Sequence, residues 1–268
     1  MPLLSVPLDE LTIVDEASFK HVAAYAALKR ALRKSSHRFR IPAPGESLSW
    51  DRATFLNLTF WSSRENADVL CEDSVPADVV AHVAWHSIVA DALSRLVSGR
   101  SPTSAPTALD LFFGESIASA FDLFLVGRLL RNAPSSDFIE TQVATMSEAA
   151  EQAGLSESDF AALLESAVAD PERAFEDLRA LLFDVTRALW ACESALDAQQ
   201  VLSSYAAHRF EPLLHHYQLS NWVLYARAYG IRSSEREAAV LALDASLRAA
   251  PVALDWLMEN WVEPAKGG

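Results

Sequence analysis

The stretch SVPADVVAHVAWHSIVADALSRLVSG, from Ser74 to Gly99, indicates the fold of this chain more clearly than any other. Ser74 can cap a helix, Pro76 and Asp78 fall in its first turn, and Gly99 can end it. The apolar residues between these ends recur with helical periodicity: Val79, Val80, Val83, Ile88, Val89 and Leu93. The stretch therefore predicts a long helix with an apolar wall.

Further segments combine apolar periodicity with capping residues in the same way. Gly, which costs about 1 kcal/mol more than Ala at a helical position, is scarce, with 8 residues. We expect helices over residues 17–34, 51–63, 108–131, 137–153, 157–169, 171–207, 212–229 and 233–250, and a last one that carries Trp256 and Trp261. The segment 51–63 is apolar enough to form a strand instead. Residues 39–50, which hold two prolines and a glycine, are expected to form an extended connection.

These elements predict an all-α fold, a compact globular domain of about nine or ten helices over residues 1–268. A chain of this length can form one large domain or two small ones. Pro171 marks the best candidate for a subdivision, near residue 170, because the segments on either side each hold enough helices to pack together.

The charge and the cysteine content narrow the classes of partner. Acidic residues outnumber basic ones by 36 to 22, which leaves a formal charge of -14 and makes nucleic acid or an anionic membrane an unfavourable partner. No segment reaches the roughly 18 consecutive apolar residues of a membrane helix, and no signal peptide is evident. Two cysteines are too few for a disulfide framework. We expect a cytoplasmic protein that acts on a small molecule or a peptide.

A polar line follows the predicted helix 74–99. His82 and His86 are four residues apart, so their imidazoles stack on one helical face and can reach a single metal ion. Asp78 lies one further turn back on the same face. Polar groups buried without partners cost about 1 to 3 kcal/mol each, so this line is expected to have a function.

The next predicted helix places two acids, Glu115 and Asp122, on one face of a strongly apolar run. Acidic side chains are seldom buried unless they are paired or bind a metal ion. His82, His86 and Glu115 would supply two nitrogen ligands and one oxygen ligand to zinc or iron, with a further position open for water or substrate. Asp122 or Asp78 could then orient an imidazole.

The segments VVAHVAWHSIVADAL and GESIASAFDLF together resemble the paired helices of gluzincin-type metallopeptidases. In that family, one helix bears two histidines around a catalytic Glu, and a second helix brings a Glu as the third ligand. The resemblance covers about 50 of 268 residues, and the separation of 29 residues between His86 and Glu115 is within the family's range. It implies a metal cradle of His82, His86 and Glu115. The position of the catalytic Glu is occupied by Val83.

The sequence does not decide between a hydrolytic and an oxidative reaction. A hydrolytic reaction would need a base other than Val83, for which Glu72, Asp73 and Asp122 are the candidates. An oxidative reaction would need iron and dioxygen. The alternative is a non-catalytic, acidic helical interaction or scaffold protein, in which the two acids face a solvated seam or pair with Arg128 or Arg131, and the aromatic-rich C-terminal helices bind partners.

A second group of histidines lies in the stretch HRFEPLLHHYQL. It consists of His208, His215 and His216, with Glu211 beside them, and Pro212 disfavours helical geometry at Glu211. Together with the first pair, these residues could form a di-iron site in a helical bundle. Such sites use Glu-x-x-His pairs, which this chain lacks, so the mononuclear site is the stronger prediction.

Overall fold

The computed structural model describes residues 2–58, 68–95 and 105–264. Helices account for 72% and strands for 7% of the residues, which confirms the predicted all-α class. The α-helices are α1 (Ala23–Lys34), α2 (Trp50–Leu58), α3 (Ala77–Arg95), α4 (Ala108–Asn132), α5 (Asp137–Gln152), α6 (Glu157–Ala169), α7 (Pro171–Trp190), α8 (Ala195–Ser204), α9 (Leu219–Tyr229), α10 (Ser234–Ala249) and α11 (Ala253–Leu257). The short 3-10 helices η1 (Leu8–Glu10), η2 (Glu16–His21) and η3 (Glu211–Tyr217) and the π-helix η4 (Met258–Val262) complete the helical part.

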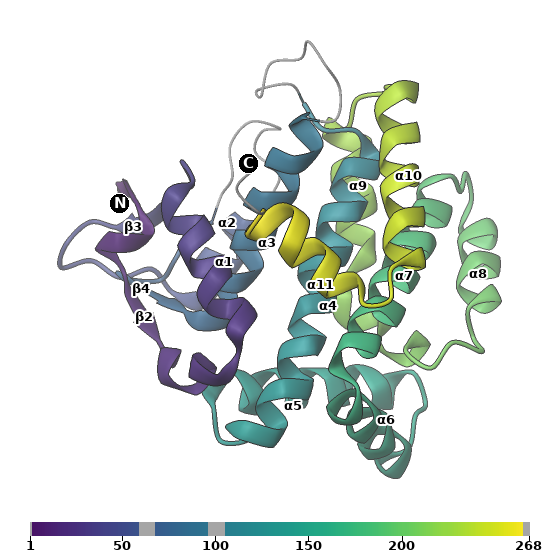
Figure 1. The fold of residues 1–268 in the computed structure, drawn as a ribbon, viewed down its shortest axis with the longest axis horizontal. Coiled ribbons are helices and arrows are strands. Elements are labelled where there is room, and N and C mark those ends of the chain that lie inside the picture. The colour runs from purple at the N-terminus through teal and green to yellow at the C-terminus, as the bar shows by residue number, and fades with distance from the viewer. Residues whose placement is uncertain (1, 59–67, 96–104, 265–268) are drawn as a thin grey trace.

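Helix α4 forms the centre of the molecule. It contacts α3, α6, α7 and α9, and Figure 1 shows the N-terminal elements on one side of it and α7 to α10 on the other. Its Thr107 N-cap and Asp110 form a capping box, in which each side chain bonds the other residue's backbone N–H. Because neighbours surround α4, most of its side chains are buried. The core that it organises extends from Val6 to Leu257 and includes residues on both sides of Pro171.

Four short strands lie on the N-terminal side, and the sequence did not predict them. β1 (Leu3–Val6) pairs antiparallel with β3 (Phe39–Pro42), within the segment expected to be an extended connection. β2 (Thr12–Val14) pairs in parallel with β4 (Ser74–Pro76), which leads directly into α3. Strands of three or four residues are too short to produce a readable alternation of apolar and polar residues.

Three of the predicted helices are interrupted. The segment 17–34 consists of η2 and α1, with extended backbone at Val22 between them. The segment 171–207 divides into α7 and α8, because Ser194 caps α8 in a box with Asp197. The segment 212–229 consists of η3 and α9, separated by Gln218 in the left-handed region at φ 50°.

Gly154 follows α5 with φ 86°, as expected of a helix stop. Ser74, expected to cap the helix that bears the histidines, lies in β4 instead, and α3 begins at Ala77. The expected stop at Gly99 lies outside the described residues.

The region from 51 to 63 is helical as far as the structure describes it, since α2 ends at Leu58 and residues 59–67 lie outside the described part. Within that part, no helix combines the length and the apolar character that crossing a membrane requires.

Gly127 is the point where α4 comes closest to the end of α6. A Cβ atom at Gly127 would lie 2.5 Å from the carbonyl oxygen of Ala167 and 3.1 Å from Cβ of Pro171. We expect Gly127→Ala to lower the free energy of unfolding by about 1 to 3 kcal/mol, as overpacking does in cores. Gly114→Ala on the same helix is the control, because its nearest contact would be an ordinary 3.7 Å. Urea unfolding of both variants checks this, and equal stability of the two would contradict the close approach.

Candidate metal centre

The two histidines of α3 lie on one face of the helix, one turn apart. The ring centroids of His82 and His86 are 4.9 Å apart, with an angle of 60° between the ring planes. About a third of each side chain is exposed, 30% for His82 and 32% for His86. The helix thus presents two imidazoles that solvent can reach.

The acids of α4 face these histidines, as the sequence predicts. Asp122 Oδ2 lies 3.0 Å from Nδ1 of His82, within hydrogen-bond distance. Glu115 Oε2 lies 3.6 Å from Nε2 of His86. Arg128 contacts Glu172 instead of either acid, so the alternative pairing with this arginine is not what the structure shows.

His82, His86 and Glu115 each offer one ligand atom, and these three atoms all lie within 4.8 Å of one another. Ligand atoms around a tetrahedral zinc ion are about 3.3 Å apart, given bonds of about 2.0 to 2.1 Å. Rotation of these partly exposed side chains can bring the ligand atoms from the separation in this structure to the shorter one around a zinc ion. Among the described residues, no other group of His, Cys, Asp or Glu side chains is arranged in this way. The three predicted ligands therefore come together, and their chemistry fits zinc or iron.

The neighbouring acids control the protonation of His82. Burial alone would favour its neutral form, but the charge and the hydrogen bond of Asp122, with the charges of Glu115 and Asp78, outweigh burial and raise the pKa of His82 to about 9. Burial and the charge of Asp122 in turn raise the pKa of Asp78 to about 6. These acids thus keep His82 protonated at neutral pH, so a metal ion that binds this imidazole would have to displace its proton. The negative charge of the acids would then attract the bound cation.

His86 behaves differently, because burial lowers its pKa and Glu115 opposes the change only in part. A neutral imidazole is the form that binds a metal ion. Its Nδ1 lies over Gly114 of α4, where an added Cβ would be 3.9 Å away. Gly114 therefore lies close beside this imidazole, at a separation that an added Cβ would keep within ordinary van der Waals contact.

A second histidine and carboxylate pair lies within electrostatic reach of His86. His37 Nε2 is 3.3 Å from Asp68 Oδ2, and the His37 side chain is only 7% exposed. Burial lowers the pKa of His37, the charge of Asp68 opposes this in part, and His86 lowers the pKa further. Neither residue stands out in the sequence, because both lie in irregular segments with no periodicity.

The residues predicted as catalytic lie in different places. Asp122 contacts His82, as described above. Glu72 and Asp73 are exposed on the segment before β4, where Glu72 accepts a hydrogen bond from Ser74 Oγ and the backbone carbonyl of Asp73 accepts one from Thr12. Val83 is buried, 5% exposed. Val83, which occupies the position expected for a base, is therefore part of the apolar core.

The second histidine cluster lies in and beside η3. His216 Nε2 is 3.1 Å from the side-chain nitrogen of Gln142 on α5, whereas His215 is exposed. His208 accepts a hydrogen bond at Nδ1 from the backbone N–H of Phe210. Within the described residues this cluster forms no group of three close ligands, in agreement with the preference for a mononuclear site.

Comparisons of this chain with protein-family models, with curated proteins and with solved structures find no match.

Proposed function

We propose that the protein is a metal-dependent enzyme with a mononuclear site made of His82, His86 and Glu115. The observation that carries the proposal is the convergence of two imidazoles and one carboxylate, with ligand atoms within 4.8 Å, on surfaces that remain about one-third exposed. A structural zinc site is closed by four protein ligands, whereas catalytic sites keep a position open. Three ligands on accessible side chains fit the second kind.

The metal ion would supply Lewis-acid chemistry if it is zinc, or oxidative chemistry if it is iron, on a small molecule or a peptide. Asp122 holds His82 through Nδ1, which leaves Nε2 for the metal. We therefore assign Asp122 to positioning His82. Because Val83 is apolar and buried, proton transfer in a hydrolytic reaction would depend on another residue. The resemblance to gluzincin helices supports the metal cradle and favours zinc.

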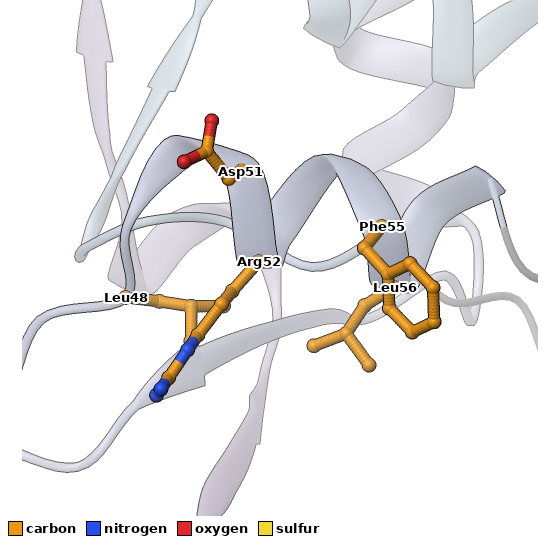
Figure 2. A pocket seen from close by; sticks show the side chains of 5 residues that line it. All are labelled: Leu48, Asp51, Arg52, Phe55 and Leu56. Carbon is orange, nitrogen blue, oxygen red and sulfur yellow. The ribbon is translucent and has the colours of Figure 1, made fainter.

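A non-catalytic interaction function is the second candidate, and the surface of α2 favours it. Trp50 is 72% exposed. The same helix borders a cavity of about 310 Å³, and Figure 2 shows the side chains of α2 and of the segment before it that line this cavity. The cavity is lined by Leu48, Asp51, Arg52, Phe55 and Leu56. By contrast, Trp256 and Trp261, on the C-terminal helices expected to bind partners, are half-buried and meet edge to face, with ring centroids 5.8 Å apart.

Titration of the metal-free protein with Zn²⁺, and with Fe²⁺ under nitrogen, tests the metal site. We expect one equivalent to bind. Glu115→Gln should weaken binding by about 100-fold, or about 2.7 kcal/mol, because a neutral amide replaces the charged ligand. Glu148→Gln, the same substitution at an exposed position of α5, is the control and should bind like the wild type. Equal affinity of the Glu115 variant and the wild type would contradict the proposed ligand set.

A further inference from the structure

The candidate metal centre holds more carboxylates than the three proposed ligands account for. Glu115 Oε2 lies 3.6 Å from Nε2 of His86, and Asp122 Oδ2 lies 3.0 Å from Nδ1 of His82. A third acid, Asp78, lies in the first turn of α3, four residues before His82 and therefore on the same face of the helix. Two acids thus contact the histidines directly, and another lies one turn away.

No basic side chain balances these acids. Among the described residues, neither Glu115 nor Asp122 forms an ion pair with a lysine or an arginine. The helices α3 and α4 contain no lysine, and their arginines lie toward the C-terminal ends. Arg128, the first arginine of α4 after Asp122, pairs with Glu172 of α7. The cationic partners of the acids at the centre are therefore the histidines and, once it is bound, the metal ion.

The net charge of the loaded centre follows from its ligands. An imidazole that binds a metal ion has given up its proton, so His82 and His86 would contribute no charge. The two positive charges of a divalent ion would be cancelled by Glu115 and Asp122. Asp78 would add a negative charge, since side chains four residues apart on a helix are about 6 Å from each other. A centre of three histidines would instead keep both charges of the ion.

We propose that the open position of this centre takes a neutral donor atom and disfavours anions. The inference rests on the proposed function and narrows its substrate class to molecules that reach the metal ion through an uncharged oxygen or nitrogen, such as an amide carbonyl. A carboxylate or a phosphate would meet a centre without net positive charge and the repulsion of Asp78. The formal charge of -14 on the whole chain acts in the same direction.

Titration of the cobalt-loaded full chain with azide, an anion, and with imidazole, a neutral donor, tests this inference. Visible absorption reports the binding of each, at about pH 8, above the pKa of about 6 of Asp78. Asp78→Asn removes a negative charge but no proposed ligand, so azide should bind about 5- to 10-fold more tightly and imidazole as before. Asp122→Asn should change azide binding in the same direction. Glu148→Gln, which removes an exposed charge of α5, is the control and should change neither affinity.

Azide affinity that stays the same or falls in both aspartate variants would overturn the inference and leave the proposed function intact. Tighter binding of azide than of imidazole to the wild type would do the same, and this comparison needs no variant to fold. A wild type that binds no cobalt would reject the inference and the proposed function together.

Discussion

Replacing Arg179 by Ala is expected to lower the free energy of unfolding by about 3 to 5 kcal/mol, since it breaks a buried ion network. Arg179 lies on α7 and is completely buried. Its Nε and Nη2 atoms each donate to Glu176 over 2.7 Å, and Nη1 donates to Asp244 of α10 over 2.8 Å. Its guanidinium also lies 5.9 Å from the ring centre of Phe113 on α4. When the guanidinium of Arg179 is removed, Asp244 stays buried. Among the described residues it then keeps its contact with Arg248.

Chemical denaturation measures this effect, and Arg173→Ala on the same helix is the control. Arg173 is 68% exposed and pairs with Asp177 one turn away. Exposed pairs of this kind contribute about 0 to 1 kcal/mol. A loss in Arg179→Ala no larger than in Arg173→Ala would show that the network does not hold α7 and α10 together.

The ion network also supports the candidate metal site. It connects α7 and α10 with α4, the helix that carries Glu115 and Asp122. Through Arg179 the network reaches Phe113, which lies two residues before Glu115 on α4. A second buried pair acts near the start of α4, where Arg236 of α10 contacts Asp110 at 2.5 Å. The helix that carries Glu115 and Asp122 is thus fixed by buried charges as well as by apolar packing.

His86→Ala is expected to reduce zinc affinity by about 1,000-fold, or about 4 kcal/mol. The substitution removes one of three protein ligands, and the neighbouring Glu115 loses the contact at 3.6 Å that places its oxygen beside the metal position. The protein should still fold, since the His86 side chain is one-third exposed. Isothermal titration of the metal-free variant with Zn²⁺ measures the loss.

His215→Ala provides a matched control for this prediction, because His215 is an exposed histidine of the second cluster. It should bind zinc with wild-type affinity. If His215→Ala lost affinity and His86→Ala did not, the metal would bind at η3 and the assignment of the site to α3 and α4 would be wrong.

Much of the fold could be predicted because its signals are local. Apolar periodicity and stops such as Gly154 lie within or directly beside the segments that they define. Caps are less reliable, since Ser74 lies in β4 although it precedes a helical pattern. Breaks inside helical segments are harder to predict. At Gln218 the backbone turns left-handed although the surrounding residues favour a helix, and the segment before it, η3, packs against α5.

Part of the candidate site could also be predicted from local sequence signals. His82 with His86 and Glu115 with Asp122 stand out as polar residues at helical spacing within apolar runs. Nothing local distinguishes His37 or Asp68, which only the tertiary fold brings within electrostatic reach of His86. The burial of Val83 is also a tertiary property, and it shows that an apolar residue at the expected base position packs in the core.

The metal content of protein purified without chelator and without a histidine tag tests the central claim most directly. Elemental analysis of the wild type should find about one zinc or iron ion per chain, as a single mononuclear site requires. His86→Ala, purified in the same way, should contain far less. Absence of metal from both proteins, or equal metal in both, would contradict the proposed centre of His82, His86 and Glu115.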